Sequence, residues 1–324
     1  MKQIFTSLKL AYSPVSNYDF YFLKKENIIQ QILDDATIYM ICQREELTFE
    51  NITYDDEFAE LKFEIHKKGN SNILECSLPI YQKNIEPNED KEIEVEFGNH
   101  KDKLTSNAMP LFDIKGMKFY SVENSLFLFW LTPDKFLHNY WNKLITANIK
   151  GNYREFTKFK VHYVGEATEQ KIWKRLTGHE KIQDILTLEK PFNYKSLNTH
   201  EITLLLFKIE NVENMNIFNG SNDIDNFIEE WTKPKIPSRK TITKDIEKAL
   251  INILKPSKKY NKKQYDNYPK SKDGLYKSNY NGIFYKIREN ITLEYEEVEI
   301  QGNTNDLKSS TIVIENNKTI ILKQ

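Results

Sequence analysis

The sequence predicts an α+β protein made of a β-rich N-terminal domain, a central mixed α/β domain whose β-sheet is flanked by helices, and a C-terminal β segment. Three observations support this fold class. Short runs with period-two alternation dominate the first hundred or so residues, strand and helix patterns follow one another from about residue 145, and strand patterns return beyond residue 282. We therefore place domains at residues 1–107, 108–277 and 278–324.

The N-terminal domain is predicted from alternating runs. A helix is expected around residues 26–35, and it precedes three strand-like segments, LKFEIHKK, NILECSLPIY and KEIEVEFG. The polar, turn-rich stretch at residues 98–107, GNHKDKLTSN, gives the first domain boundary. Nothing in this domain resembles a catalytic motif, so we expect it to recognise the target or to bind a protein partner.

The central domain combines strands and helices. MPLFDIKGMKFYSV and SLFLFWL are predicted strands, and a helix is expected at residues 133–144. KFKVHYVG is a strand that ends at a glycine, EQKIWKRLTGHEKIQDIL forms one helix or two, and ITLLLFKI has the length of a buried strand. A helix is also expected around residues 224–231. In KDIEKALINILKP the apolar residues recur at helical spacing and Pro256 ends the helix.

The C-terminal segment is predicted to be β-structure. GIFYKIRE, ITLEYEEVEI, STIVIE and KTIILK are its strand-like runs. The last two are expected to form a hairpin around Asn316-Asn317.

Charge is distributed unevenly along the chain. The net charge is −1, yet residues 233–277 carry fourteen Lys or Arg against four Asp or Glu, so the remaining chain is acidic. Tyr260, Tyr265, Tyr268 and Tyr276 interrupt this basic stretch, and such a pattern favours lysines that neutralise phosphates and rings that stack on bases. A solvated lysine-rich face is the alternative.

Two cysteines, Cys42 and Cys76, lie far apart without a metal-binding or disulfide pattern, so buried free thiols are expected. The chain has no apolar run long enough to cross a membrane and no secretory signal pattern at its N-terminus, so we expect a cytoplasmic location.

Residues 163–179 carry the strongest chemical signal. Arg175 and His179 are four residues apart, and on one helix face they would form a pair suited to phosphate: the guanidinium stabilises negative charge and the imidazole orients water or moves a proton. Tyr163 offers a hydroxyl at the end of a strand, beside a glycine, Gly165, that lets a backbone or phosphate come close.

The order Tyr163-x-Gly165 and then Arg175-x-x-x-His179 resembles the GIY-YIG nuclease superfamily, whose second strand ends in YIG or YVG and whose first helix carries this Arg and His. A later helix of that family carries a glutamate, followed by Pro and Asn. Here Glu247 precedes Pro256 and Asn261 in the same order. The resemblance covers roughly residues 145–271 and implies a small mixed α/β nuclease domain, with residues 211–238 as an insertion.

The resemblance also implies the roles of single residues. Glu247 would hold one divalent ion, Mg²⁺ or Mn²⁺, and the catalytic groups would be Tyr163, Arg175, His179 and Glu247. Nucleic acid, most plausibly DNA, would be bound by Gly165, Lys174, Lys255, Lys258, Lys259, Asn261 and Lys262.

The first strand of the family pattern, GIY, has two candidates here. Gly151-Asn152-Tyr153 stands at the expected distance before the YVG strand and makes Tyr153 a fifth candidate catalytic residue. Alternatively the first strand is LFLFWL, residues 126–131, with the helix at 133–144 inserted in the hairpin. Gly282-Ile283-Phe284-Tyr285 follows the Glu247 helix, so we interpret it as an ordinary strand.

These observations support three functions. The first is a metal-dependent endonuclease that hydrolyses phosphodiester bonds. The second is a catalytically weak or inactive nucleic-acid-binding module that uses the basic stretch. The third is a protein-interaction module whose acidic remainder would repel a polyanion.

Overall fold

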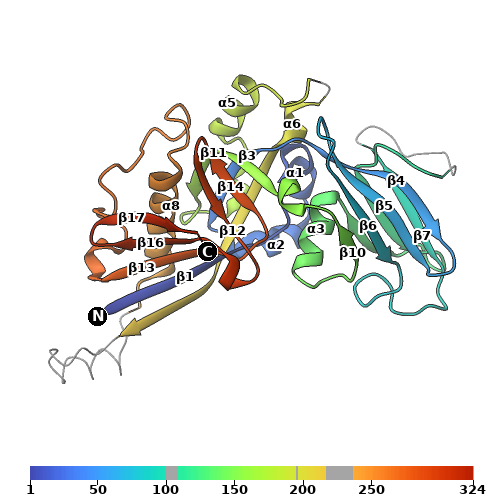
Figure 1. Cartoon of the computed structure of the whole chain (residues 1–324), viewed down its shortest axis with the longest axis horizontal. Helices are drawn as coiled ribbons and strands as arrows, with labels where there is room; N and C mark the ends of the chain where they lie inside the picture. Colours follow the sequence, from blue (N-terminus) through green and yellow to red (C-terminus); the bar gives the residue numbers. More distant parts are fainter. Residues whose placement is uncertain (100–108, 195, 217–235, 324) are drawn as a thin grey trace. The chain divides into compact units, whose positions relative to one another are not determined.

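The computed structural model describes residues 1–99, 109–194, 196–216 and 236–323, and the chain divides into two compact units (Figure 1). Unit 1 comprises residues 1–43, 159–189 and 202–324, and unit 2 comprises residues 44–158 and 190–201. Unit 2 is thus inserted twice into the sequence of unit 1. The domain boundaries expected after residues 107 and 277 each fall inside a unit.

Unit 1 is built on one mixed sheet, which contains ten strands within the described residues. Its order is β15-β14-β11-β3-β12-β1-β13-β16-β17, with β2 paired to β12. The pair of β1 with β13 is parallel, and each other pair with a known register is antiparallel. The strands are β1 (Lys2–Leu10), β2 (Val15–Ser16), β3 (Ile38–Gln43), β11 (Lys158–Glu166), β12 (Ile202–Asn216), β13 (Gly282–Ile287), β14 (Thr292–Tyr295), β15 (Val298–Gln301), β16 (Thr311–Glu315) and β17 (Lys318–Leu322).

This sheet overturns the expected fold class. The prediction of a small mixed α/β domain between separate β-rich regions is wrong, because strands from both ends of the chain pair with β11 and β12 in a single large sheet and strand residues outnumber helical ones. The physical reason is that alternation in a strand tells which residues face a core, whereas the strand that supplies its hydrogen bonds can lie anywhere in the sequence.

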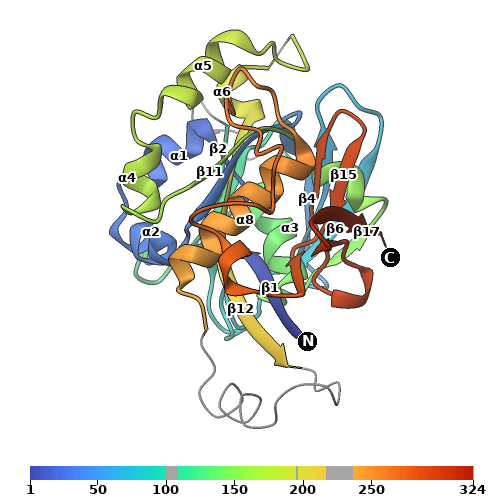
Figure 2. The ribbon, with the colours of Figure 1, turned by 90° about the vertical axis from the view of Figure 1, so that its left-hand side faces the viewer.

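Helix α8 (Arg239–Leu254) lies across the sheet of unit 1 (Figure 2). Ser238 caps its N-terminus by accepting a hydrogen bond from Thr241 N–H, and Lys255 ends it in the left-handed conformation just before Pro256. The predicted apolar set packs into the core with residues of β1, β3, β11 and β12: Ile246, Ala249, Leu250 and Leu254 are buried and Ile253 is partly buried.

Shorter helices complete unit 1. They are α1 (Asn17–Leu23), α2 (Asn27–Ile32), η1 (Leu33–Asp35), α4 (Ile172–Leu176), α5 (Glu180–Leu188), η3 (Leu275–Ser278) and η4 (Asp306–Lys308). The helix expected around residues 26–35 is present as α2 and η1. The predicted C-terminal hairpin is also present, because β16 pairs with β17 across Asn316 and Asn317, which both have positive φ.

Unit 2 has its own sheets and its own core. One sheet has the order β10-β6-β5-β4 and the other β7-β8-β9, and α3 packs its Phe136 against Phe63 of β5. The elements are β4 (Leu47–Asp55), β5 (Glu60–Lys67), β6 (Ile73–Pro79), β7 (Ile93–Gly98), β8 (Gly116–Ser121), β9 (Phe127–Leu131), α3 (Pro133–Trp141), β10 (Asn148–Lys150), η2 (Tyr153–Phe156) and α6 (Asn198–Glu201).

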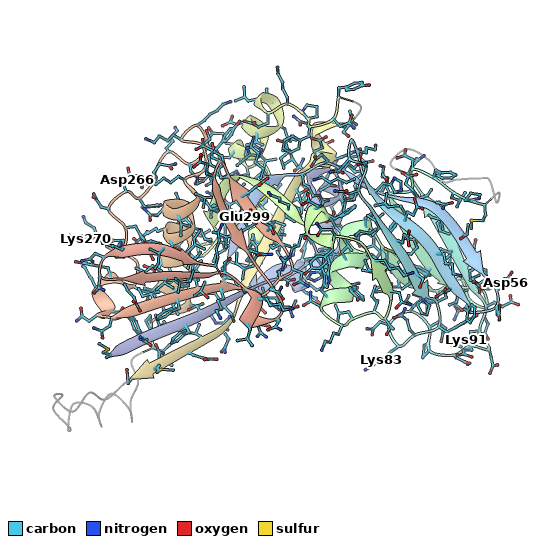
Figure 3. All side chains as sticks on the ribbon, viewed as in Figure 1. Asp56, Lys83, Lys91, Asp266, Lys270 and Glu299 are labelled. Atoms are coloured by element: carbon cyan, nitrogen blue, oxygen red, sulfur yellow. The ribbon has the colours of Figure 1, made fainter. Side chains whose placement is uncertain are left out.

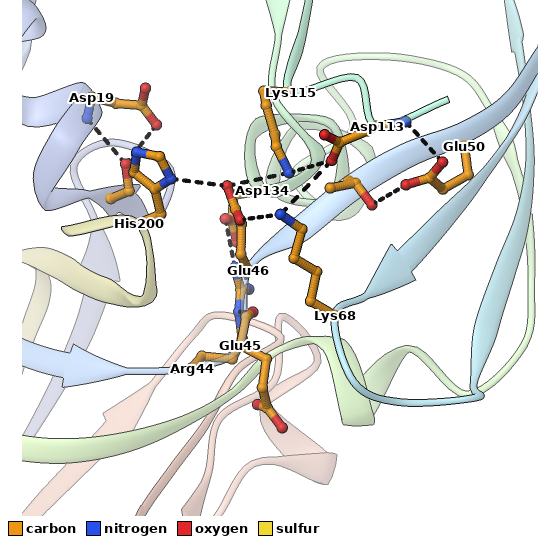
Figure 4. Close-up of polar contacts among 12 residues, drawn as sticks. Asp19, Arg44, Glu45, Glu46, Glu50, Lys68, Asp113, Lys115, Asp134 and His200 are labelled. Carbon is orange, nitrogen blue, oxygen red and sulfur yellow. Dashed lines mark hydrogen bonds and ion pairs between the residues drawn. The ribbon is translucent and has the colours of Figure 1, made fainter. Parts of the chain in front are cut away.

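A buried carboxylate fastens distant segments of unit 2 together (Figure 4). A Glu46 carboxylate oxygen lies 2.8 Å from Lys68 Nζ, 3.2 Å from Lys115 Nζ and 3.3 Å from His200 Nδ1. Nearby, Arg44 forms a two-pronged pair with Asp134 at 2.7 and 2.8 Å. The His200 contact links the second insertion, residues 190–201, to the first one, and the lysines pair the buried Glu46 charge, which would be unfavourable alone.

The remaining sequence predictions concern undescribed segments, the cysteines and membrane spans. The helix expected around residues 224–231 lies outside the described residues, as do much of the 98–107 boundary and the first three residues of the basic stretch. Cys42 and Cys76 are buried free thiols, as expected. Within the described parts of the chain, no helix is both long and apolar enough to span a bilayer.

Candidate active site

The strand that carries Tyr163 pairs with β3, and this pairing brings a second tyrosine into the site. In the antiparallel register of β11 and β3, Gly165 stands opposite Tyr39 and Tyr163 stands opposite Ile41. The rings of Tyr39 and Tyr163 are therefore diagonal neighbours, with their centroids 5.9 Å apart, and their hydroxyls are hydrogen-bonded. Tyr39 was not among the residues expected from the sequence.

Gly165 is required by the close approach of these two rings. A Cβ at this position would lie 2.6 Å from Oη and Cζ of Tyr39 and 2.7 Å from Cε1 of Tyr163. Side-chain atoms do not approach this closely, so only glycine fits. Gly165 is also buried, which makes it a spacer between tyrosines and not the phosphate contact that the sequence suggested.

Arg175 and His179 belong to two helices. Helix α4 ends at Leu176, Gly178 adopts a positive φ of 71°, and His179 is the N-cap of α5. The expectation that both residues project from one helix is therefore wrong, because the glycine breaks the helix between them.

His179 nevertheless points at the tyrosine pair. Its Nδ1 accepts a hydrogen bond from Lys181 N–H at 3.2 Å, so the ring proton sits on Nε2, which donates to Tyr39 Oη at 2.8 Å. The imidazole also lies 5.5 Å from each tyrosine ring, centroid to centroid. A side chain that caps a helix is held in one orientation, and this orients Tyr39 in turn.

Charges around the tyrosines favour a neutral histidine. Burial, with the positive charges of Arg175 and Lys181, lowers the pKa of His179 to about 4. Burial raises the pKa of Tyr163, although the hydrogen bond from Tyr39 opposes this. Near neutral pH the site therefore holds two protonated phenols and an uncharged imidazole.

The guanidinium of Arg175 is exposed and adjoins the tyrosines. It hydrogen-bonds the Tyr39 hydroxyl and, among the described residues, forms no ion pair with a carboxylate. An arginine that is oriented by a neutral hydroxyl keeps its charge available for an anion such as phosphate.

Glu247 lies on α8, close enough to the site for its charge to act on Tyr163. Burial, with the negative charges of Glu166 and Asp273, raises the pKa of its carboxyl to about 7 against the opposing charge of Lys248. Within the described residues the Glu247 carboxylate has no hydrogen bond or ion pair, because Lys248 pairs with Asp273 instead.

This environment is suitable for a cation. In the described residues no three His, Cys, Asp or Glu side chains cluster as ligands would. Mg²⁺, however, binds proteins through one or two carboxylates and fills its remaining positions with water and substrate oxygens. Glu247 can supply such a carboxylate. Burial and the neighbouring carboxylates make its negative charge unfavourable, and a bound cation would relieve this.

The lysines expected to bind nucleic acid are exposed and, in the described part of the chain, carry no ion pair: Lys174, Lys255, Lys258, Lys259 and Lys262. Two of them lie beside aromatic rings, Lys174 at 5.2 Å from Trp173 and Lys259 at 5.2 Å from Tyr260. The surface after α8 therefore presents unneutralised positive charge.

The tyrosines of the basic stretch differ in exposure. Tyr260 is buried and donates to Glu189 at 2.6 Å, and Tyr268 is buried and donates to Asp245 at 2.6 Å. Neither ring can stack on a base, which corrects the expectation for these two. Tyr276 is 42% exposed and remains able to stack.

Asn261 is also buried, and both polar atoms of its amide bond the backbone of Val164 in β11. It holds the strand of Tyr163 in place, so the expected contact with nucleic acid is replaced by a structural role.

Both candidates for the first strand of the family pattern are wrong. Tyr153 lies in η2 of unit 2, where its ring contacts Trp141 at 4.8 Å between centroids. Segment 127–131 forms β9, whose partner is β8. The neighbours of β11 are β14 and β3. The signal that could have revealed β3 is Thr37-Ile38-Tyr39, an apolar strand start with a tyrosine, far upstream of the region searched.

Comparison with known proteins provides no relative: no family model, no curated protein and no solved structure matches this chain.

Proposed function

We propose that the protein is a metal-dependent endonuclease that hydrolyses phosphodiester bonds, with DNA as its substrate. One observation carries the proposal: Tyr39, Tyr163, Arg175 and His179 form a single hydrogen-bonded group, and the charge of Glu247 acts on it. The proposal concerns the site alone. In this site, the strand that begins Thr37-Ile38-Tyr39 would correspond to the GIY strand of the family pattern. Residues 44–158 of unit 2 would then replace the short turn that joins the two strands in that pattern.

Each side chain has a role that its surroundings favour. Arg175 would bind the phosphate and stabilise the charge that develops in the transition state. His179 would hold Tyr39 in position through the Nε2–H bond. Because burial keeps Tyr163 a phenol, we assign its oxygen to orienting the attacking water and not to removing a proton.

Glu247 would hold the divalent ion, Mg²⁺ or Mn²⁺. When bound, such an ion would polarise a phosphate oxygen and stabilise the leaving oxygen. The exposed lysines after α8 would hold the flanking phosphates of the nucleic acid. The two buried thiols suit a reducing compartment, which favours the cytoplasm.

Plasmid nicking with Mg²⁺ or Mn²⁺ tests the proposal. Glu247→Gln keeps the shape of the side chain but removes the charge, so nicking should fall at least about 100-fold. The exposed Glu297→Gln is the matched control and should nick like the unmodified protein. Circular dichroism should show both variants folded. Nicking by Glu247→Gln at the unmodified rate would refute the proposed function.

Binding without turnover is the second candidate, favoured by the exposed lysines that have no ion pair in the described residues. It predicts that a duplex is retained in a salt-sensitive manner while no nicking occurs with either metal.

A further inference from the structure

Tyr265 has a backbone conformation that tyrosines rarely adopt. Its φ is 51°, in the left-handed region, which is unfavourable for a bulky side chain. Two hydrogen bonds to its carbonyl hold it there, from Asn252 Nδ2 at 3.0 Å and from Tyr268 N–H at 2.8 Å. Glycine or asparagine would adopt this turn at lower cost, so the presence of tyrosine suggests that the side chain itself is needed.

The turn places the ring between the core and the site. Tyr265 is partly buried against the core of unit 1, and Lys248 Nζ lies 5.9 Å from its ring centroid. Its loop neighbours Asp266 and Lys270 behave differently, because their exposed side chains extend away from the ribbon (Figure 3). The loop therefore directs one aromatic side chain inward, next to the residue that follows Glu247.

The Tyr265 hydroxyl is surrounded by acidic groups of the candidate site. Burial, with the negative charges of Glu247, Asp273 and Glu166, raises its pKa to about 12. A hydroxyl in such surroundings stays protonated and acts as a hydrogen-bond donor. Within the described residues it has no hydrogen-bond partner, so the donor is available to a ligand.

We propose that Tyr265 contacts the substrate, donating a hydrogen bond from its hydroxyl to a non-bridging oxygen of the phosphate held beside Glu247. This inference rests on the proposed endonuclease function. A neutral donor suits the position, since the carboxylates around it would repel a phosphate and Arg175 is the exposed cation at the tyrosine pair. Tyr265 would then be a third tyrosine of the site, contributed by the loop after α8.

The test compares Tyr265→Phe with Tyr54→Phe, a matched removal of one hydroxyl from an exposed ring of β4 in unit 2. Plasmid nicking is measured across Mg²⁺ concentrations, well below the melting temperature of each variant. Tyr265→Phe should lower kcat/KM about 10- to 100-fold, the effect of losing a hydrogen bond to a charged group. The Mg²⁺ concentration for half-maximal nicking should be unchanged. Tyr54→Phe should keep its kcat/KM.

A second measurement follows binding of a fluorescein-labelled DNA duplex by anisotropy, in Ca²⁺ to slow cleavage. Tyr265→Phe should bind more weakly than Tyr54→Phe. The inference fails if Tyr265→Phe nicks and binds like the unmodified protein, or if only its Mg²⁺ dependence shifts, which would place the hydroxyl on the metal ligands.

The two proposals can fail separately. If the unmodified protein nicks DNA and Tyr265→Phe nicks it equally well, only the role of Tyr265 falls. If the unmodified protein nicks no DNA with either metal, the endonuclease and the substrate contact fall together.

Discussion

Asn261 and Val164 are joined by two hydrogen bonds. Asn261 Oδ1 accepts from Val164 N–H at 3.0 Å, and its Nδ2 donates to Val164 O at 2.9 Å. A side-chain amide carries one acceptor and one donor group in a fixed plane, so it satisfies both backbone groups of a single residue as a neighbouring strand would. The loop after α8 is thereby fastened to β11 between Tyr163 and Gly165.

Asn261→Asp should destabilise unit 1. The carboxylate can still accept from Val164 N–H, but it has no donor for Val164 O and would be buried as a charge. We expect a loss of about 2–3 kcal/mol in the free energy of unfolding. Urea denaturation followed by circular dichroism measures it, with the exposed Asn267→Asp as control. Equal stability of the two variants would show that the amide bonds contribute little.

Gly165→Ala should separate the two tyrosines. The added methyl group would lie 2.6 Å from Tyr39 Oη, so at least one ring must move. We expect a stability loss of about 1–3 kcal/mol and a marked loss of nicking, because the hydroxyls would no longer be aligned. Gly98→Ala is the control, since nothing lies within 4 Å of a Cβ there. Unaltered melting temperature and nicking in Gly165→Ala would contradict the observed packing.

His179 should make stability fall on acidification. Its pKa is about 4 in the folded protein and about 6.5 in an unfolded chain, so between these values the unfolded state binds more protons. Stability should therefore decrease as pH falls from 6.5 to 4, by about 2–3 kcal/mol from this residue.

His179→Asn tests this, because asparagine preserves a helix N-cap but does not titrate. Urea unfolding from pH 4 to pH 7 should show a shallower dependence on pH than in the unmodified protein. His66→Asn, which removes a partly exposed histidine, serves for comparison. The same slope in His179→Asn and the unmodified protein would rule out a neutral, buried His179.

Lys135 should give unit 2 a dependence of the same sign, at higher pH. Burial lowers its pKa to about 7, while an unfolded lysine titrates near 10.4, so the unfolded state binds more protons between these values. Stability from this residue should rise as pH increases from 7 to 10. Trp130 offsets part of the cost at neutral pH, because the ammonium lies 4.1 Å from its ring centroid and the ring face attracts a cation.

Lys135→Met should remove this dependence and raise stability at pH 7 by about 1–2 kcal/mol. Urea unfolding monitored by tryptophan fluorescence at pH 7 and pH 10 measures both effects. Lys118→Met is the control, since its side chain is 52% exposed. A loss of stability in Lys135→Met at pH 7 would mean that the cation–ring contact outweighs burial.

Much of the local structure follows from local sequence. The apolar spacing around Ile246 and the stop at Pro256 predict α8, and Asn316-Asn317 predicts the last hairpin. These features depend on the preferences and caps of neighbouring residues, which a sequence displays directly. For the same reason Glu247 could be placed on a helix, whereas Gly178 was not recognised as a helix break.

The amino-acid sequence by itself determined that Tyr163 lies in a strand, that a glycine follows two residues later, and that Arg175, His179 and Glu247 come after it in this order. Only the tertiary structure decided that Tyr39 is the partner tyrosine, that Asn261 serves the fold, and that strands from both ends of the chain join one sheet. The physical reason is that strands pair through backbone groups that every residue carries. The partner of β11 was therefore not visible in its sequence. Residues 44–158 of unit 2 separate β3 from β11, so no short hairpin turn marks the pair.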